Sequence, residues 1–305
     1  MGTLPAVAIS APPASCVRVV AVVSNKGGVG KTTVASNLAI YLRALREDLP
    51  ILVMGLDDQT LLDRMFALEP LAPDGANLKH GWAERCLDRA VRLGQYGVHF
   101  VPSPPETEGL KSRAEDPQTL ARILARSKWE GVVILDTKSD LEALTRNALH
   151  AADRAILPVA DRASLDEARK VFAILERSRR ADRARVLLTL VDARTRVEPH
   201  GGLDLRAVLE REVERCGWPR YRTHLSRSPR AEALLSAGGT PLSILHHARG
   251  TQVYGQMRAL AEEVLADLGL AAPGPETPLR PSPPAPRAAG VADWKSALLR
   301  GLRGR

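Results

Sequence analysis

The 305-residue chain has few aromatic residues, few cysteines and no long apolar run. Aromatic side chains make up 4% of it, so we expect an aliphatic core. No stretch approaches the ~18 consecutive apolar residues of a membrane-spanning helix. The three cysteines, Cys16, Cys86 and Cys216, are far apart and form no C-x-x-C pair, which argues against a disulfide framework and a zinc site. These absences indicate a reduced, cytoplasmic protein.

The N-terminal segment lacks the features of a secretory signal. Residues 1–16 contain no basic residue, and Pro12 and Pro13 interrupt their apolar positions. We expect this segment to be disordered. It is also too short for a helix-turn-helix domain, so we do not expect sequence-specific operator binding. Disorder of the whole chain is excluded by its hydrophobic fraction of 45% and its charged fraction of 26%.

Positive charge is concentrated in the C-terminal half. The chain has a net charge of +8, and residues 177–230 alone hold fourteen arginines, no lysine and seven acids. Residues 271–305 hold six basic residues and two acids. Such a distribution indicates a polyanionic partner, either nucleic acid or anionic lipid. A solvated arginine-rich surface is the alternative, because the chain uses 35 arginines and only 8 lysines throughout.

Short apolar runs alternate with amphipathic helical patterns along the chain. The runs expected as strands are 17–23, 51–56, 98–101, 132–135, 155–160 and 186–191. The helical patterns are 31–46, 120–127, 141–152, 164–177, 203–216 and 250–268. This alternation predicts an α/β fold with a mostly parallel sheet and helices on both faces.

The composition changes after residue 270. Residues 271–290 contain seven prolines, which predicts an extended or disordered linker. Residues 291–305 again show apolar positions three and four apart, with basic residues between them. We therefore expect one domain over residues 17–270, then the linker, then a short basic amphipathic tail that is flexibly attached.

A glycine-rich loop joins the first expected strand to the first expected helix. Backbone N–H groups and the helix dipole converge at such a junction, where they bind phosphate. Three glycines let the backbone approach phosphate oxygens, Lys31 neutralises the β- and γ-phosphates, and Thr32 can ligate Mg²⁺. The residues expected to bind nucleotide are Lys26, Gly27, Gly28, Val29, Gly30, Lys31, Thr32 and Thr33. Asn25 replaces the first glycine of the common motif, and Lys26 adds a second lysine.

The segment K-G-G-V-G-K-T resembles the deviant Walker A loop of the ParA/MinD ATPases. The resemblance extends over about residues 17–268 and implies a P-loop NTPase fold that binds ATP and Mg²⁺. It also implies an ATP-sandwich homodimer whose weak hydrolase activity is stimulated by a partner protein. In that family the second lysine reaches the partner's ATP, which implies a catalytic role for Lys26 across the dimer.

Two acids stand where the family has functional carboxylates. Asp57 and Gln59 match a D-x-D-P-Q segment, which implies that Asp57 orients the attacking water; a helix N-cap is the alternative role. Gly55 replaces the first acid of that segment and Asp58 the proline, which leaves the hydrolysis rate open. Asp136 ends the apolar run 132–135 in the manner of a Walker B strand, so we expect it to hold an Mg²⁺-bound water, with Thr32 as the metal's other protein ligand.

Two arginine-containing segments resemble the ParA branch, which the sequence therefore favours over MinD. They lie at 188–196 and 227–233, and their candidate DNA-binding residues are Arg194, Arg196, Arg227 and Arg230. In ParA proteins the arginines matching Arg194 and Arg230 help the ATP-bound dimer hold DNA without sequence preference, through phosphate neutralisation. Surface arginines that cap nearby carbonyls are the alternative.

The resemblance implies a nucleoid-associated ATPase that segregates or positions a cargo, with a ParB-like protein or a cargo adaptor as the stimulating partner. The cargo is a plasmid or chromosome partition complex, or a protein cluster; the sequence does not choose between them. A MinD-like positioning ATPase is the alternative, with the tail 291–305 as its membrane-binding helix. A nitrogenase-reductase-like carrier would need paired cysteines that are missing. No sequence feature indicates the substrate pocket of a metabolite-modifying P-loop enzyme.

Overall fold

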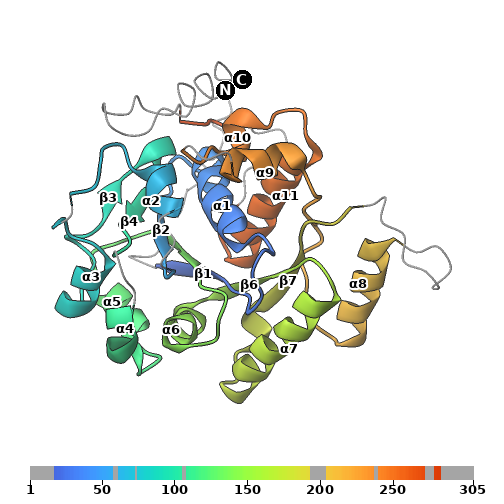
Figure 1. Cartoon of the computed structure of the whole chain (residues 1–305), viewed down its shortest axis with the longest axis horizontal. Helices are drawn as coiled ribbons and strands as arrows, with labels where there is room; N and C mark the ends of the chain where they lie inside the picture. Colours follow the sequence, from blue (N-terminus) through green and yellow to red (C-terminus); the bar gives the residue numbers. More distant parts are fainter. Residues whose placement is uncertain are drawn as a thin grey trace, which may run out of the picture.

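Figure 1 shows the computed structural model of the chain, in which a sheet lies between two layers of helices. The structure describes residues 17–57, 61–72, 74–104, 108–192, 204–236, 240–271 and 278–282. The predicted N-terminal segment 1–16 and the predicted tail 291–305 therefore lie outside the described residues. Of the predicted linker, only residues 271 and 278–282 are described.

Seven strands within the described residues form one sheet, in the order β3-β4-β2-β5-β1-β6-β7. Their bounds are β1 Arg18–Val22, β2 Ile51–Gly55, β3 Arg92–Leu93, β4 His99–Val101, β5 Val132–Asp136, β6 Arg154–Val159 and β7 Ala184–Leu188. Neighbouring strands are parallel except β3, which pairs antiparallel with β4. The first strand is central, so its side chains are buried on both faces, as its continuous apolar run predicts.

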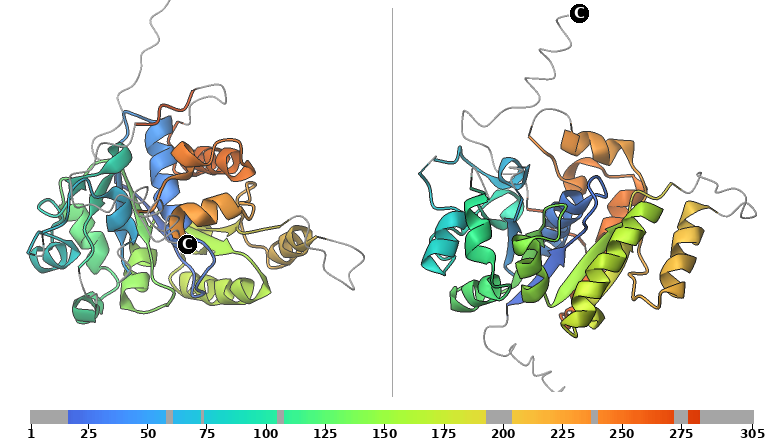
Figure 2. Two further views of the ribbon diagram at one scale, coloured as in Figure 1. Left: turned by 45° about the horizontal axis from the view of Figure 1, so that its top comes forward. Right: turned by 60° about the horizontal axis from the view of Figure 1, so that its bottom comes forward.

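Helices cover both faces of the sheet (Figures 1 and 2). One layer contains α1 Lys31–Leu45, α2 Leu61–Phe66, α9 Pro229–Ser236, α10 Ile244–His247 and α11 Gln252–Asp267. The other contains α3 Leu78–Glu84, α4 Glu108–Lys111, α5 Thr119–Arg126, α6 Ala143–Ala151, α7 Arg162–Arg177 and α8 Leu205–Arg215. Side chains at alternate positions of β1 pack against the two helical layers in turn. Val20 and Val22 pack toward α1, whereas Val19 and Ala21 pack toward the other layer. The predicted mostly parallel α/β fold is confirmed.

The long predicted elements are present with small shifts at their ends, while several short ones were not predicted. Strand β7 begins two residues earlier than expected and ends at Leu188, because the chain turns at Leu190, whose φ is 55°. The unpredicted elements are β3, α2, α3, α4, α9 and α10. Apart from the eight-residue α9, they span two to seven residues, too short for hydrophobic periodicity to reveal them.

In the described part of the chain, no helix is long and apolar enough to cross a membrane. The buried side chains are mostly valine, leucine, isoleucine and alanine, in agreement with the aliphatic core expected from the composition. Cys86 and Cys216 are both free thiols, and Cys16 lies outside the described residues.

Candidate functional site

The phosphate-binding loop connects the carboxyl end of β1 to the first turn of α1. Gly28 and Gly30 have φ values of 76° and 88°, which an L side chain rarely adopts, so the loop conformation requires glycine at both positions. No acidic residue lies in the first turn of α1. The free N–H groups of that turn and the positive end of the helix dipole are therefore available to an anion.

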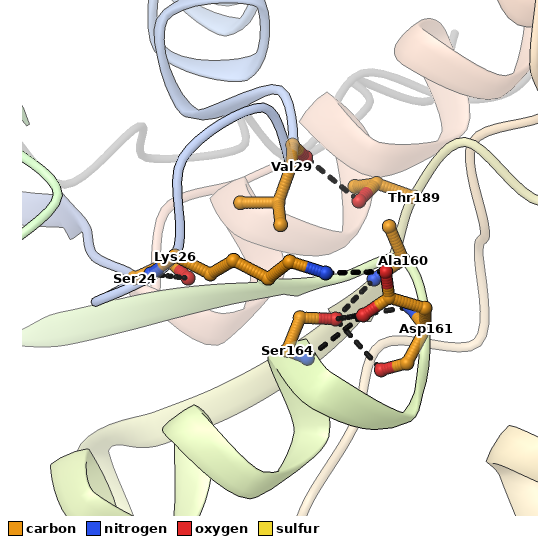
Figure 3. A network of polar contacts seen from close by, with 7 residues as sticks. All are labelled: Ser24, Lys26, Val29, Ala160, Asp161, Ser164 and Thr189. Carbon is orange, nitrogen blue, oxygen red and sulfur yellow. Dashed lines mark hydrogen bonds and ion pairs between the residues drawn. The ribbon is translucent and has the colours of Figure 1, made fainter.

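Two hydroxyl groups fix this loop (Figure 3). Ser24 Oγ accepts a hydrogen bond from the Lys26 N–H at 3.2 Å. Thr189, which follows β7, donates from Oγ1 to the Val29 carbonyl at 2.9 Å and is itself buried. One contact lies at the start of the loop and the other ties its middle to the end of β7, so the backbone of the loop is fixed at two points.

Lys31 is buried among polar groups beneath the loop. It is only 7% exposed, and its Nζ donates to Ser139 Oγ at 2.6 Å and to the Lys26 carbonyl at 3.2 Å. Burial lowers the pKa of this lysine, and the negative charges of Asp136, Asp57 and Asp140 oppose the shift. The structure thus brings the predicted phosphate-binding lysine and the two predicted carboxylates into one electrostatic neighbourhood.

Asp136 lies at the end of β5, opposite Val22 of β1, and is 3% exposed. Burial raises its pKa to about 7, against the opposing effects of the Thr32 hydroxyl, which donates to it, and of Lys31. Its Oδ1 atom has no hydrogen-bond partner among the described residues. A buried carboxylate oxygen left unpaired beside a threonine hydroxyl and a phosphate loop fits Mg²⁺, which prefers hard oxygen ligands.

The predicted metal ligands do not form a metal site by themselves. Among the residues that the structure describes, no three His, Cys, Asp or Glu side chains cluster as a metal cage. This agrees with a magnesium ion that takes one or two protein ligands and completes its shell with phosphate oxygens and water.

Asp57 follows β2 and is partly exposed, close enough to Lys31 and Asp136 to influence the pKa of each. Asp58 and Gln59 lie outside the described residues. A Cβ atom at Gly55 would lie 3.3 Å from Leu62 Cδ1 and 3.4 Å from Ser103 Oγ. The place of the family's first acid is therefore taken up by these two neighbouring side chains.

The side chain of Lys26, the second lysine, extends toward Asp161 at the start of α7 (Figure 3). Its Nζ lies 2.5 Å from Asp161 Oδ2, and the two side chains are 33% and 46% exposed. Asp161 is the N-cap of α7: its other oxygen accepts from the Ser164 N–H at 2.8 Å, and Ser164 completes a capping box. Lys26 is thus held by its own subunit, at the surface.

An apolar pocket adjoins the loop on the side of α1. Its walls come from segments far apart in sequence, and include Gly30, Thr33, Leu190, Ile244 and Met257. This pocket is next to the phosphate site and has the apolar lining that a planar base needs.

The described candidates for DNA contact lie at the rim of this pocket. Arg227 and Arg230 are both exposed, and the residues between and after them, including Ser228 and Ala231, line the pocket. Arg227 forms an ion pair with Glu232 at 3.1 Å. Arg194 and Arg196 lie outside the described residues.

The loop contacts that sequence reasoning missed include three residues that follow strands, Ser139, Asp161 and Thr189. The D-x-x-S pattern of Asp161 and Ser164 does signal a helix start. No sequence pattern, however, links these three residues to the loop, because each follows a different strand.

The family described as the CobQ/CobB/MinD/ParA nucleotide binding domain matches residues 20–228. The chain belongs to this family. The chromosome-partitioning ATPase Soj of Thermus thermophilus is 32% identical over 257 residues, which cover 82% of this chain and 96% of Soj. These findings confirm the resemblance drawn from the loop and identify the chain as a ParA/MinD-type P-loop ATPase.

Solved structures share the fold. A point variant of Cyanothece McdA in complex with ATP has a TM-score of 0.65 at 16% identity, covering 85% of this chain and 99% of McdA. Cobyrinic acid a,c-diamide synthase of Mycobacterium smegmatis, with a bound ATP analogue and magnesium, has a TM-score of 0.62 at 22% identity and covers 88% and 99% of the two chains. At such identities the likeness shows the fold alone.

Proposed function

We propose that this protein is a ParA-like ATPase that dimerises around ATP, binds nucleoid DNA without sequence preference and segregates or positions a cargo. The observation that carries the proposal is the different placement of the two loop lysines. Lys31 is buried beneath its own phosphate loop, whereas Lys26 lies at the surface, beside Asp161. Of the two lysines, only the partly exposed Lys26 would reach another subunit's nucleotide, once it leaves Asp161. The similarity to Soj supports the same conclusion.

The loop residues divide the work of binding ATP. The glycine N–H groups and the N-terminus of α1 bind the phosphates, and Lys31 neutralises their charge. Thr32 and Asp136 would hold Mg²⁺, which when bound neutralises charge that develops on the phosphates. Asp57, at the partly exposed end of β2, would orient the attacking water. The apolar pocket next to Gly30 would receive the base.

Hydrolysis is proposed to be weak and to depend on a partner. Lys26 would reach a second nucleotide only after it leaves Asp161. In the isolated subunit the ion pair with Asp161 therefore keeps Lys26 away from its proposed catalytic position. A ParB-like protein or a cargo adaptor would act on the ATP-bound dimer. Arg194, Arg196, Arg227 and Arg230 are proposed to contact DNA phosphates in that dimer, which would associate the protein with the nucleoid.

Three variants separate these roles. Lys31→Ala is expected to abolish ATP binding, because the phosphate charge is no longer neutralised. Lys26→Ala is expected to retain ATP binding and to lose the dimer, and Asp57→Ala to accumulate an ATP-bound dimer. Nucleotide binding is measured by fluorescence and dimerisation by size-exclusion chromatography with light scattering. If Lys26→Ala dimerises with ATP as the wild type does, the cross-subunit role of Lys26 is wrong.

A further inference from the structure

A short segment of the proline-rich region, residues 278–282, packs on the domain far from the phosphate loop. We call this segment the strap. The Arg280 N–H donates to the carbonyl of Ala44, at the C-terminal end of α1, at 3.0 Å. Leu279 packs against the apolar layer that contains α1 and α11. The predicted linker is therefore bound to the domain at these residues.

The strap packs against the turn at Gly97, where the absence of a side chain leaves room for Ser282. Gly97 has a φ of 69°, and a Cβ atom there would lie 3.1 Å from Ser282 Oγ. The Gly97 carbonyl accepts a hydrogen bond from Arg43 Nε of α1 at 3.1 Å. The groove for the strap thus consists of the end of α1, the turn around Gly97, and α10.

His246 of α10 connects the strap to the fold. Its Nε2 lies 3.1 Å from the Ser282 carbonyl, and its Nδ1 lies 2.6 Å from Ser243 Oγ. A carbonyl only accepts hydrogen bonds, so Nε2 carries the proton and Nδ1 accepts from the Ser243 hydroxyl. The ring packs at 4.8 Å on Tyr96, which precedes Gly97. Both ring nitrogens are therefore committed to one arrangement of strap and helix.

The other end of α10 contacts the nucleotide site. The Ile244 N–H donates to Asn37 Oδ1 at 2.8 Å, and Asn37 Nδ2 donates to the Thr33 carbonyl at 3.0 Å. Asn37 is completely buried in α1, and Ile244 lines the apolar pocket beside the phosphate loop. A continuous series of hydrogen bonds thus leads from Ser282 through α10 to Thr33.

We propose that the docked strap holds α10 against α1 and thereby retains the bound nucleotide, so that displacement of the strap speeds nucleotide release. Helix α10 has only four residues, and a helix of one turn has no stability of its own. Its position depends on the buried side chains of Ile244 and Leu245 and on the hydrogen bonds at its two ends, to the strap and to Asn37. By linkage, bound nucleotide strengthens strap docking by the same factor.

The sharpest test changes one backbone group of the strap. Arg280→Pro removes the N–H that binds Ala44, whereas Arg280→Ala keeps it and removes only the exposed side chain, which lies 3.6 Å from Glu47. In the full-length protein, Arg280→Pro is expected to speed the dissociation of a fluorescent ATP analogue about fivefold, the effect of losing one net hydrogen bond. Arg280→Ala is expected to leave the rate unchanged. Stopped-flow fluorescence measures both.

A second pair of variants acts on the other strap contact. His246→Leu removes the donor to Ser282 and is expected to speed dissociation to a similar extent. His246→Gln retains an N–H donor at the end of the side chain and is expected to restore most of the slow rate. Hydrogen exchange supplies the reverse measurement: saturating ATP analogue is expected to slow exchange of the strap amides, which a purely structural contact would not do.

The inference is overturned if Arg280→Pro or His246→Leu releases nucleotide at the wild-type rate, or if nucleotide leaves strap exchange unchanged. It rests on the proposed function for the choice of ATP as the nucleotide and for the placement of its base in the apolar pocket beside Gly30. Failure of the wild-type protein to bind the ATP analogue would instead refute the proposed function. The two failures are therefore distinguishable.

Discussion

Lys26 and Lys31 lie five positions apart in the same loop, but Lys31 is buried and Lys26 is partly exposed. Lys31 is desolvated and lies close to the carboxylates of Asp136, Asp57 and Asp140. Lys26 forms a partly exposed ion pair whose partner belongs to a helix start. The motif identifies both lysines in the sequence. Which of the two is buried is known only from the structure.

The ion pair between Lys26 and Asp161 opposes dimerisation in the proposed function. Asp161→Asn removes the charge that holds Lys26 but keeps an amide oxygen able to cap α7. A partly exposed ion pair contributes at most about 1 kcal/mol, and both subunits of a dimer release one. The variant is therefore expected to dimerise with ATP at a concentration up to about thirtyfold lower. Analytical ultracentrifugation with ATP measures this.

Asp166→Asn is the control for Asp161→Asn. Asp166 lies in the same helix, and among the residues that the structure describes its carboxylate pairs only with Arg169, 3.4 Å away. Its dimerisation should equal that of the wild type. Equal dimerisation by Asp161→Asn would show that the ion pair does not restrain Lys26.

Asp63 gives the protein a pH-dependent stability. Burial raises its pKa to about 6, although the Ser103 N–H and hydroxyl, which donate to it, lower the pKa in part. A carboxyl whose pKa is higher in the folded state binds more protons there, so stability is greatest below the unfolded pKa and falls as pH rises through the folded one. Between pH 4 and 7 the loss is about 2 kcal/mol, at 1.36 kcal/mol per pKa unit.

Asp63→Asn is expected to remove this loss, because an amide does not ionise and can still accept the Ser103 N–H. Urea unfolding of both proteins at several pH values checks it. The difference in unfolding free energy between variant and wild type should grow in the variant's favour from pH 4 to pH 7. A constant difference would show that Asp63 has an ordinary pKa.

At the scale of elements, the sequence predicts what is long and regular. Each central strand is a continuous apolar run, and α1, α7 and α11 span fifteen or sixteen residues with clear periodicity. The antiparallel edge strand β3 has two residues and α10 has four. Neither is long enough to show a periodic pattern of apolar residues in the sequence. Docking of the strap was also unpredictable, since proline-rich composition indicates low helix and sheet content but not binding to the domain.

Gly131 controls where β5 enters the sheet. Its φ is 119°, and a Cβ atom there would lie 2.2 Å from the carbonyl oxygen of Pro50, just before β2. The next residue, Val132, donates to that same oxygen, so the two segments cannot separate without losing a sheet contact. Gly131→Ala is expected to lower the free energy of unfolding by about 3 kcal/mol or more.

Gly109→Ala is the matched control, because a Cβ atom at Gly109 in α4 meets no other atom within 4 Å. Its unfolding free energy should remain within about 0.5 kcal/mol of wild type. Thermal or urea unfolding measures both variants. Similar stability of the two would mean that the segments at Pro50 and Gly131 separate at little cost.

For the whole molecule, DNA binding should follow from charge and depend on the dimer. The Arg194→Glu, Arg230→Glu double variant is expected to lose DNA binding and to keep ATP-dependent dimerisation. Wild-type binding should be equal on unrelated sequences and should weaken steeply with salt, since each phosphate contact adds about −0.9 to the slope of log K against log salt concentration. Mobility shifts at two salt concentrations measure this.

The control for DNA binding reverses two exposed arginines of the opposite helical layer, Arg89→Glu and Arg122→Glu, and should bind DNA nearly as wild type. Deletion of residues 291–305 should also leave DNA binding largely unchanged. Sedimentation with anionic liposomes tests the MinD-like alternative. Normal DNA binding by the Arg194, Arg230 variant, together with liposome binding that needs residues 291–305, would favour a membrane-positioned ATPase.

The position of β1 in the sheet has a consequence for how the chain is made. Arg18 pairs with Val132, so β1 cannot pair with β5 until residues more than a hundred positions later have been synthesised. At about 5–20 residues per second, the ribosome needs roughly 6–23 s to supply them. During that interval the apolar β1 and β2 both lack their common neighbour β5, and the nascent chain is exposed to aggregation or to chaperone binding. Slow translation before β5 should lengthen this exposure, whereas slow translation after Asp136 should not.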